Sequence, residues 1–126
     1  MNKINIIPAP VTVEELYQEM NETLDHPEYH ITIINVLSEK YFQDCKIEAS
    51  INIPAKAIAD YVDDWDRTKT IVVYDAADDS DAGVEAYQTL IDMGFDDVRR
   101  LVGGLKEWHD KEYPTEGACT MDHLYK

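Results

Sequence analysis

The chain has 126 residues, the length of one ordinary domain, and 44% of them are hydrophobic, which excludes intrinsic disorder and allows one core. A formal net charge of -15 excludes nucleic acid and anionic membranes as expected partners, because both are negatively charged, and favours a protein with a basic surface. The chain lacks the roughly 20 consecutive apolar residues that cross a bilayer, and its first apolar stretch is too short for a signal peptide, so the expected location is cytoplasmic.

The first predicted element is a helix that begins after Thr12. Residues 12–15 form a capping box, in which Thr12 accepts from a first-turn amide and Glu15 reaches back to the Thr12 amide. Apolar side chains then recur every three or four residues, which predicts one buried stripe along the helix. The stripe consists of Val13, Leu16, Tyr17, Met20 and Leu24. Residues 25–27 contain a proline and end the helix.

Two short apolar runs, residues 30–36 and 70–74, predict strands that are covered on both faces. The segment between them predicts short helices over residues 38–43 and 55–62, with an extended piece at 50–53. Strands of this kind, separated by helical segments, are typical of an α/β fold in which a central, mainly parallel sheet has helices on both faces.

The second half of the chain continues the same alternation. A helix that begins after Asp81 ends at Gly94, residues 98–102 predict a strand, and residues 105–111 predict a closing helix. Residues from Thr115 onward lack periodicity and predict a loosely held tail. The expected organisation is therefore a single domain over residues 1–126, with its core at about 12–114 and a tail at 115–126.

The loop after the second strand is the expected functional site. Ligands of open parallel sheets bind beyond the carboxyl ends of strands, where a helix N-terminus offers unpaired N–H groups to an anion or a thiolate. The residues of this loop are Asp75, Ala76, Ala77, Asp78, Asp79, Ser80 and Asp81. The loop therefore contains four acids and no thiol.

The two cysteines, Cys45 and Cys119, are far apart in the sequence and form no Cys-x-x-Cys pair. This spacing indicates neither a zinc site nor a disulfide framework, and the expectation is two free thiols. No metal or other cofactor is predicted.

Several motifs resemble those of rhodanese-like domains, which are sulfurtransferases. In the second half these are Thr-Ile-Val-Val-Tyr at 70–74, Gly-Phe-Asp-Asp-Val at 94–98, Gly-Gly-Leu-Lys-Glu-Trp at 103–108, and Tyr-Pro at 113–114. In the first half, residues 41–54 match the family segment Tyr-x-x-Gly-His-Ile-x-Gly-Ala-x-Asn-Ile-Pro. Because order and spacing agree over about residues 12–114, the resemblance implies a rhodanese-like fold for nearly the whole chain.

The same resemblance implies that the family activity is absent. The sulfur-accepting cysteine of the family directly follows the Val-Val-Tyr strand, and Asp75 stands there; Ser80 stands where some members have a second cysteine. Asn35 and Leu37 replace the Asp and Arg of the Asp-Val-Arg motif, and Cys45-Lys46 replaces Gly-His. No catalytic residue is expected, and a binding or regulatory role follows, with the partner and the oligomeric state left open.

Two alternatives remain at this point. The first is a sulfurtransferase that uses a relocated thiol, either Cys45 or Cys119. The second is a cation-dependent site, such as a phosphatase site, built from the loop carboxylates, although their spacing does not fit an EF-hand. Against the second stands a solvated acidic loop in which Ser80 or Asp81 caps the following helix.

Overall fold

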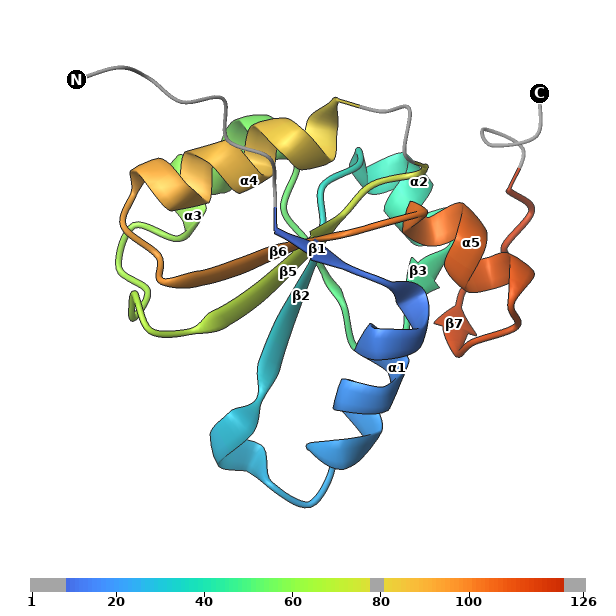
Figure 1. The fold of residues 1–126 in the computed structure, drawn as a ribbon. Coiled ribbons are helices and arrows are strands. Elements are labelled where there is room, and N and C mark those ends of the chain that lie inside the picture. Colours follow the sequence, from blue (N-terminus) through green and yellow to red (C-terminus); the bar gives the residue numbers. More distant parts are fainter. Residues whose placement is uncertain (1–8, 78–80, 122–126) are drawn as a thin grey trace.

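The computed structural model describes residues 9–77 and 81–121, and its centre is a five-stranded parallel sheet (Figure 1). The strands of this sheet are β1 (Pro10–Val11), β2 (Ile31–Asn35), β4 (Ile51–Asn52), β5 (Thr70–Tyr74) and β6 (Asp97–Leu101). They lie side by side in the order β1-β6-β5-β2-β4. Register is set at the centre, where Ile33 of β2 lies opposite Val72 of β5.

Helices cover both faces of the sheet, which confirms the predicted fold class. The helices are α1 (Val13–Glu22), α2 (Glu39–Asp44), α3 (Ile58–Tyr61), α4 (Ala82–Asp92) and α5 (Gly104–Asp110), with 3-10 turns at Pro27–Tyr29 and Ala55–Ala57. Figure 1 shows α3 and α4 on one face and α1 and α5 on the other. Among the described residues, no helix combines the length and apolarity that crossing a membrane requires.

The core consists of two layers because side chains of a strand point alternately to opposite faces. Along β5, Ile71 and Val73 pack into the layer beneath α4, while Val72 and Tyr74 pack into the layer that contains Trp108 of α5. These four side chains are fully buried, whereas Thr70 at the start of β5 is half-buried. A strand that is buried on both faces reads as a continuous apolar run, which is why β5 was predictable.

The start of α1 also follows the prediction. Glu15 donates its N–H to the Thr12 hydroxyl at 3.1 Å, and the Thr12 N–H donates to the Glu15 carboxylate at 2.9 Å. The predicted burial of Leu24 is wrong, because α1 ends at Glu22 and the Leu24 side chain is 76% exposed. Thr23 is the C-cap residue of α1, and its hydroxyl donates to the Glu19 carbonyl at 2.9 Å, so Leu24 lies beyond the helix end.

The prediction of a loosely held tail is wrong for residues 115–121. β7 (Thr115–Glu116) pairs antiparallel with β3 (Lys46–Ile47). The Asp44 carboxylate then accepts the N–H groups of Thr120 and Met121, at 3.0 and 3.1 Å. Met121 is 1% exposed and belongs to the core, so this segment is part of the packed fold.

Candidate active-site loop

The candidate site begins where β5 ends and the chain passes toward α4. The first N–H groups of a helix have no partner within the helix, and we call those of Ala82, Gly83 and Val84 the α4 cradle. Asp75, the first residue after β5, is 1% exposed, and its carboxylate accepts the Gly83 N–H at 2.8 Å. The side chain at the predicted sulfur-accepting position therefore lies inside the fold and bonds the α4 cradle.

The backbone of the same residues is held by a second helix. Asp75 and Ala76 offer their carbonyl oxygens to the N–H groups of Leu105 and Lys106 in α5, both at 2.9 Å. This close approach requires glycine at position 104, where φ is +61° and an added Cβ would lie 2.7 Å from the Asp75 carbonyl oxygen. Asp75 is thus fixed through both its side chain and its backbone.

Position 83 requires glycine for a similar reason. A Cβ there would lie 2.8 Å from the Asp75 carboxylate and 3.2 Å from Nε of Arg100. The Asp75 carboxylate and the Arg100 side chain therefore both approach the first turn of α4. The sequence did not indicate Arg100 or Gly83 as site residues, because neither belongs to the predicted loop.

The rest of the predicted loop contributes less to this arrangement. Ala76 and Ala77 are half-buried, whereas Asp81 is exposed. Asp81 is the N-cap residue of α4 but makes no side-chain capping bond, so the predicted cap by Asp81 is wrong, and the carboxylate that bonds the first turn is that of Asp75. Asp78, Asp79 and Ser80 lie outside the described residues.

Metal coordination finds no support in the described parts of the loop. Within residues 9–77 and 81–121, no three His, Cys, Asp or Glu side chains are close enough to hold a metal ion. The Asp75 carboxylate is already bonded to the Gly83 N–H.

Tyr74 links the ends of three strands next to the site. Its buried hydroxyl accepts the Ile47 N–H and the Asn35 side-chain amide, both at 3.0 Å, and lies 2.8 Å from the Ser50 hydroxyl. Since Ser50 donates to the Ile47 carbonyl at 2.7 Å, the Tyr74 hydroxyl donates to Ser50. Burial raises the pKa of Tyr74, and its hydrogen bonds with Ser50, Ile47 and Asn35 oppose that rise. The sequence predicted Tyr74 only as a strand residue.

The prediction that both cysteines are free thiols is wrong. Cys45 and Cys119 form a disulfide, with Cα atoms 4.4 Å apart, so in this structure neither is a free thiol. The bond joins the C-cap residue of α2 to the segment after β7, and the Cys119 N–H donates to the Asp44 carbonyl at 2.7 Å. Sequence spacing could not show this pairing because the β3–β7 ladder, which brings the two residues together, was not predicted.

A parallel sheet covered by helices, with a helix N-terminus directed at the loop after its central strand, defines a class of small α/β domains. Ligands of this class bind beyond the carboxyl ends of the strands. The sequence matches the family described as Rhodanese-like domain over residues 12–111, and the chain belongs to this family. It is 28% identical over 82 residues to the thiosulfate sulfurtransferase GlpE of Shewanella oneidensis, an alignment that covers 64% of this chain and 77% of that protein.

Two solved structures are similar in fold. The BH2092 protein of Bacillus halodurans has a TM-score of 0.77 at 20% identity, covering 89% of this chain and 79% of that one. A rhodanese-like domain from Anabaena sp. has a TM-score of 0.76 at 23% identity, covering 96% of this chain and 87% of that one. At these identities the likeness establishes the fold and leaves the activity to the residues of the site.

Proposed function

We propose that this chain is a rhodanese-like domain that does not transfer sulfur and that acts as a binding or regulatory module for a protein with a basic surface. The observation that carries the proposal is the bond between the Asp75 carboxylate and the Gly83 N–H. The resemblance implies that backbone amides at this end of β5 hold the persulfide in active members, and we count the α4 cradle among them. The carboxylate takes one of them and offers no nucleophilic sulfur.

Electrostatics support the proposal. Two unit negative charges about 5 Å apart, at an effective dielectric constant of about 20, repel each other by roughly 3 kcal/mol. A helix N-terminus contributes only about 0.3–1 kcal/mol in favour of an anion. The buried Asp75 carboxylate therefore opposes a second anion by more than the α4 N-terminus alone attracts it. Arg100, which approaches the same turn, offsets part of this repulsion, and we expect weak thiosulfate binding.

The direct test is thiosulfate:cyanide sulfurtransferase activity of the purified protein. The thiosulfate sulfurtransferase of Shewanella oneidensis, assayed in parallel, serves as the positive control. We expect turnover at the uncatalysed background, and little gain from Asp75→Cys, because the acids around the new thiol still repel the donor. Turnover well above background in a Cys45→Ser, Cys119→Ser double variant would overturn the proposal.

A relocated thiol is the competing function. It requires that the Cys45–Cys119 bond first be reduced, since a disulfide sulfur is neither a thiolate nor a free acceptor. Mass spectrometry after reduction and thiosulfate treatment separates the two functions. A persulfide on Cys45 or Cys119, together with turnover that the double variant loses, would support the relocated thiol.

The expected location remains the cytoplasm, where glutathione and thioredoxin keep most thiols reduced. We therefore expect Cys45 and Cys119 to be reduced in cells and to oxidise to the disulfide in air-exposed protein. Acid quenching of cells, alkylation and mass spectrometry of the protein would check this. A fully formed disulfide in cells would argue for an oxidising compartment.

A further inference from the structure

The most exposed large apolar side chains of the described residues lie at the opposite end of the sheet from Asp75. Leu24 is 76% exposed and Tyr29 is 66% exposed. They flank the connection from α1 to β2, which enters the sheet at Ile31. Single exposed apolar residues are common, so the shape and the charge around these two decide whether they form a binding surface.

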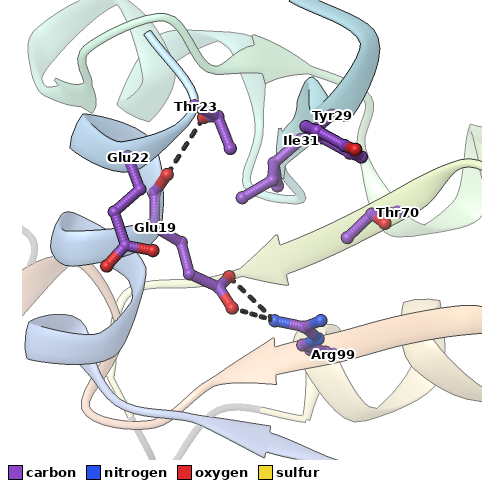
Figure 2. A pocket seen from close by; sticks show the side chains of 7 residues that line it. All are labelled: Glu19, Glu22, Thr23, Tyr29, Ile31, Thr70 and Arg99. Atoms are coloured by element: carbon purple, nitrogen blue, oxygen red, sulfur yellow. Dashed lines mark hydrogen bonds and ion pairs between the residues drawn. The ribbon is translucent and has the colours of Figure 1, made fainter. Parts of the chain in front are cut away.

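The surface around them is hollowed. One hollow of about 330 Å³ lies between α1 and the first residues of β2 and β5, with Thr23, Tyr29 and Ile31 in its wall (Figure 2). A second hollow of about 440 Å³ shares Thr23 and Ile31 with the first and extends between Leu24 and Ala49. We call the two together the Leu24 groove. Ile31 is 9% exposed and Ile33 is 3% exposed, which gives the groove an apolar floor.

The rim of the Leu24 groove is acidic. Glu19 is paired with Arg99, whose Nη1 lies 2.8 Å from the carboxylate, and Arg99 also pairs with Asp97. Glu22 lies apart from Arg99, with Glu19 between them in Figure 2, and Glu48 lines the second hollow. Neither Glu22 nor Glu48 forms an ion pair with a base of residues 9–77 or 81–121. The rim therefore offers two carboxylates to a basic ligand.

We propose that the Leu24 groove receives a leucine- or phenylalanine-sized side chain of a partner protein, flanked by lysine or arginine residues that meet Glu22 and Glu48. The inference rests on the proposed binding function and gives that function a location away from the Asp75 loop. Charge complementarity selects this occupant. A second copy of the chain would bring the same carboxylates, and a net charge of -15, against the same rim.

The test uses the isotope-labelled 126-residue chain and three synthetic probe peptides, observed by NMR. The first probe is acetyl-Lys-Lys-Leu-Phe-Lys-Lys-amide, the second replaces Leu-Phe with Ser-Ser, and the third replaces every Lys with Glu. We expect saturable shifts at residues 23–24, 30–31 and 49 with the first probe alone, and weaker binding at higher salt. Equal shifts with the Ser-Ser probe, or no saturable shift with any probe, would overturn the proposal.

Matched variants locate the binding. Leu24→Ser should lower the affinity for the first probe at least fivefold. Tyr61→Ser, at a 60% exposed tyrosine of α3, should leave that affinity within twofold of the wild type. Because both side chains are exposed, both variants should fold, which circular dichroism checks. Unchanged affinity in Leu24→Ser would contradict the inference.

Two further outcomes keep this inference separate from the proposed function. Probe shifts confined to residues 75–77 and 81–83 would overturn the groove and leave the binding function standing. Sedimentation that shows a dimer lost in Leu24→Ser would place a second copy in the groove and overturn the basic partner. Failure of the proposed function itself would appear as sulfurtransferase turnover, which none of these measurements detects.

Discussion

Asp75 carries most of the chemistry of the candidate site. A buried carboxylate is costly unless hydrogen bonds compensate its lost hydration, and here the Gly83 N–H supplies one at 2.8 Å. The partial positive charge at the start of α4 favours the same anion. The resemblance places a cysteine at this position in active members, whereas the aspartate of this chain bonds one amide of the α4 cradle.

Removal of the Asp75 side chain tests its bond to α4. Asp75→Ala leaves the buried Gly83 N–H without its acceptor, which should lower the free energy of unfolding by about 1–3 kcal/mol. Urea unfolding measures this. Asp81→Ala is the matched control, because Asp81 is an exposed N-cap residue without a side-chain capping bond, and should change stability by less than about 0.5 kcal/mol. Equal effects of the two changes would contradict the described bond.

Tyr74 offers a test by substitution and by pH. Tyr74→Phe removes a hydroxyl with three hydrogen-bonding neighbours, so the free energy of unfolding should fall by about 1–3 kcal/mol. Its folded-state pKa is raised above the ordinary value of 10.0, chiefly by burial. The unfolded state therefore loses the proton first, and stability that is present below pH 10.0 decreases as pH rises above it.

Denaturant unfolding from neutral pH to above pH 10.0 should show a weaker alkaline loss of stability in Tyr74→Phe than in the wild type. Tyr61→Phe, at an exposed tyrosine, should behave as the wild type does. If the free energy of unfolding decreases equally with rising pH in the wild type and in Tyr74→Phe, Tyr74 does not contribute to the alkaline loss of stability.

At the scale of elements, local signals decide what the sequence predicts. The β5 run is apolar on both faces, and the capping box at Thr12 has its residues within one helical turn, so both are visible in the sequence. β1 and β7 have two residues each, too few for any periodicity. The exposure of Leu24 depends on where α1 ends, and the Cys45–Cys119 bond depends on which distant segments pair. Local sequence patterns indicate neither.

The capping box gives a prediction with a close control. Thr12→Ala removes the acceptor of the Glu15 N–H and should lower the free energy of unfolding by about 1 kcal/mol. Ser38→Ala, at the N-cap of α2, should have little effect, because Ser38 makes no side-chain capping bond. Thermal unfolding monitored by circular dichroism compares the two. A larger loss in Ser38→Ala would contradict the assignment.

The disulfide ties the last described segment to α2. Cys119→Ser should lower the free energy of unfolding by about 2–4 kcal/mol in protein purified without reductant, because the open chain gains conformational freedom when unfolded. An excess of reductant opens the disulfide of the wild type. The free energy of unfolding of the wild type should then fall close to that of Cys119→Ser. If reductant leaves the wild type unchanged and Cys119→Ser is equally stable, the bond does not form in solution.

At the scale of the whole molecule, the comparisons show the fold, and the lack of sulfur transfer is our proposal. The family match over residues 12–111 and the structural neighbours confirm the predicted rhodanese-like α/β fold. That fold brings the loop after β5 to the N-terminus of α4, where its members perform chemistry, and the Leu24 groove lies at the other end of the sheet. Under the two proposals, the Asp75 carboxylate closes the first end and the Leu24 groove at the second end binds the partner.

The central claim is that Asp75 occupies the α4 cradle and keeps other anions out. The Gly83 amide resonance, followed by NMR during a thiosulfate titration, reports on this directly because Gly83 donates to the Asp75 carboxylate. We predict no saturable shift of Gly83 in the wild type and a saturable shift in Asp75→Ala, where the amide is released. A saturable shift of Gly83 in the wild type would contradict the claim, because it would show thiosulfate at an amide that Asp75 is said to hold.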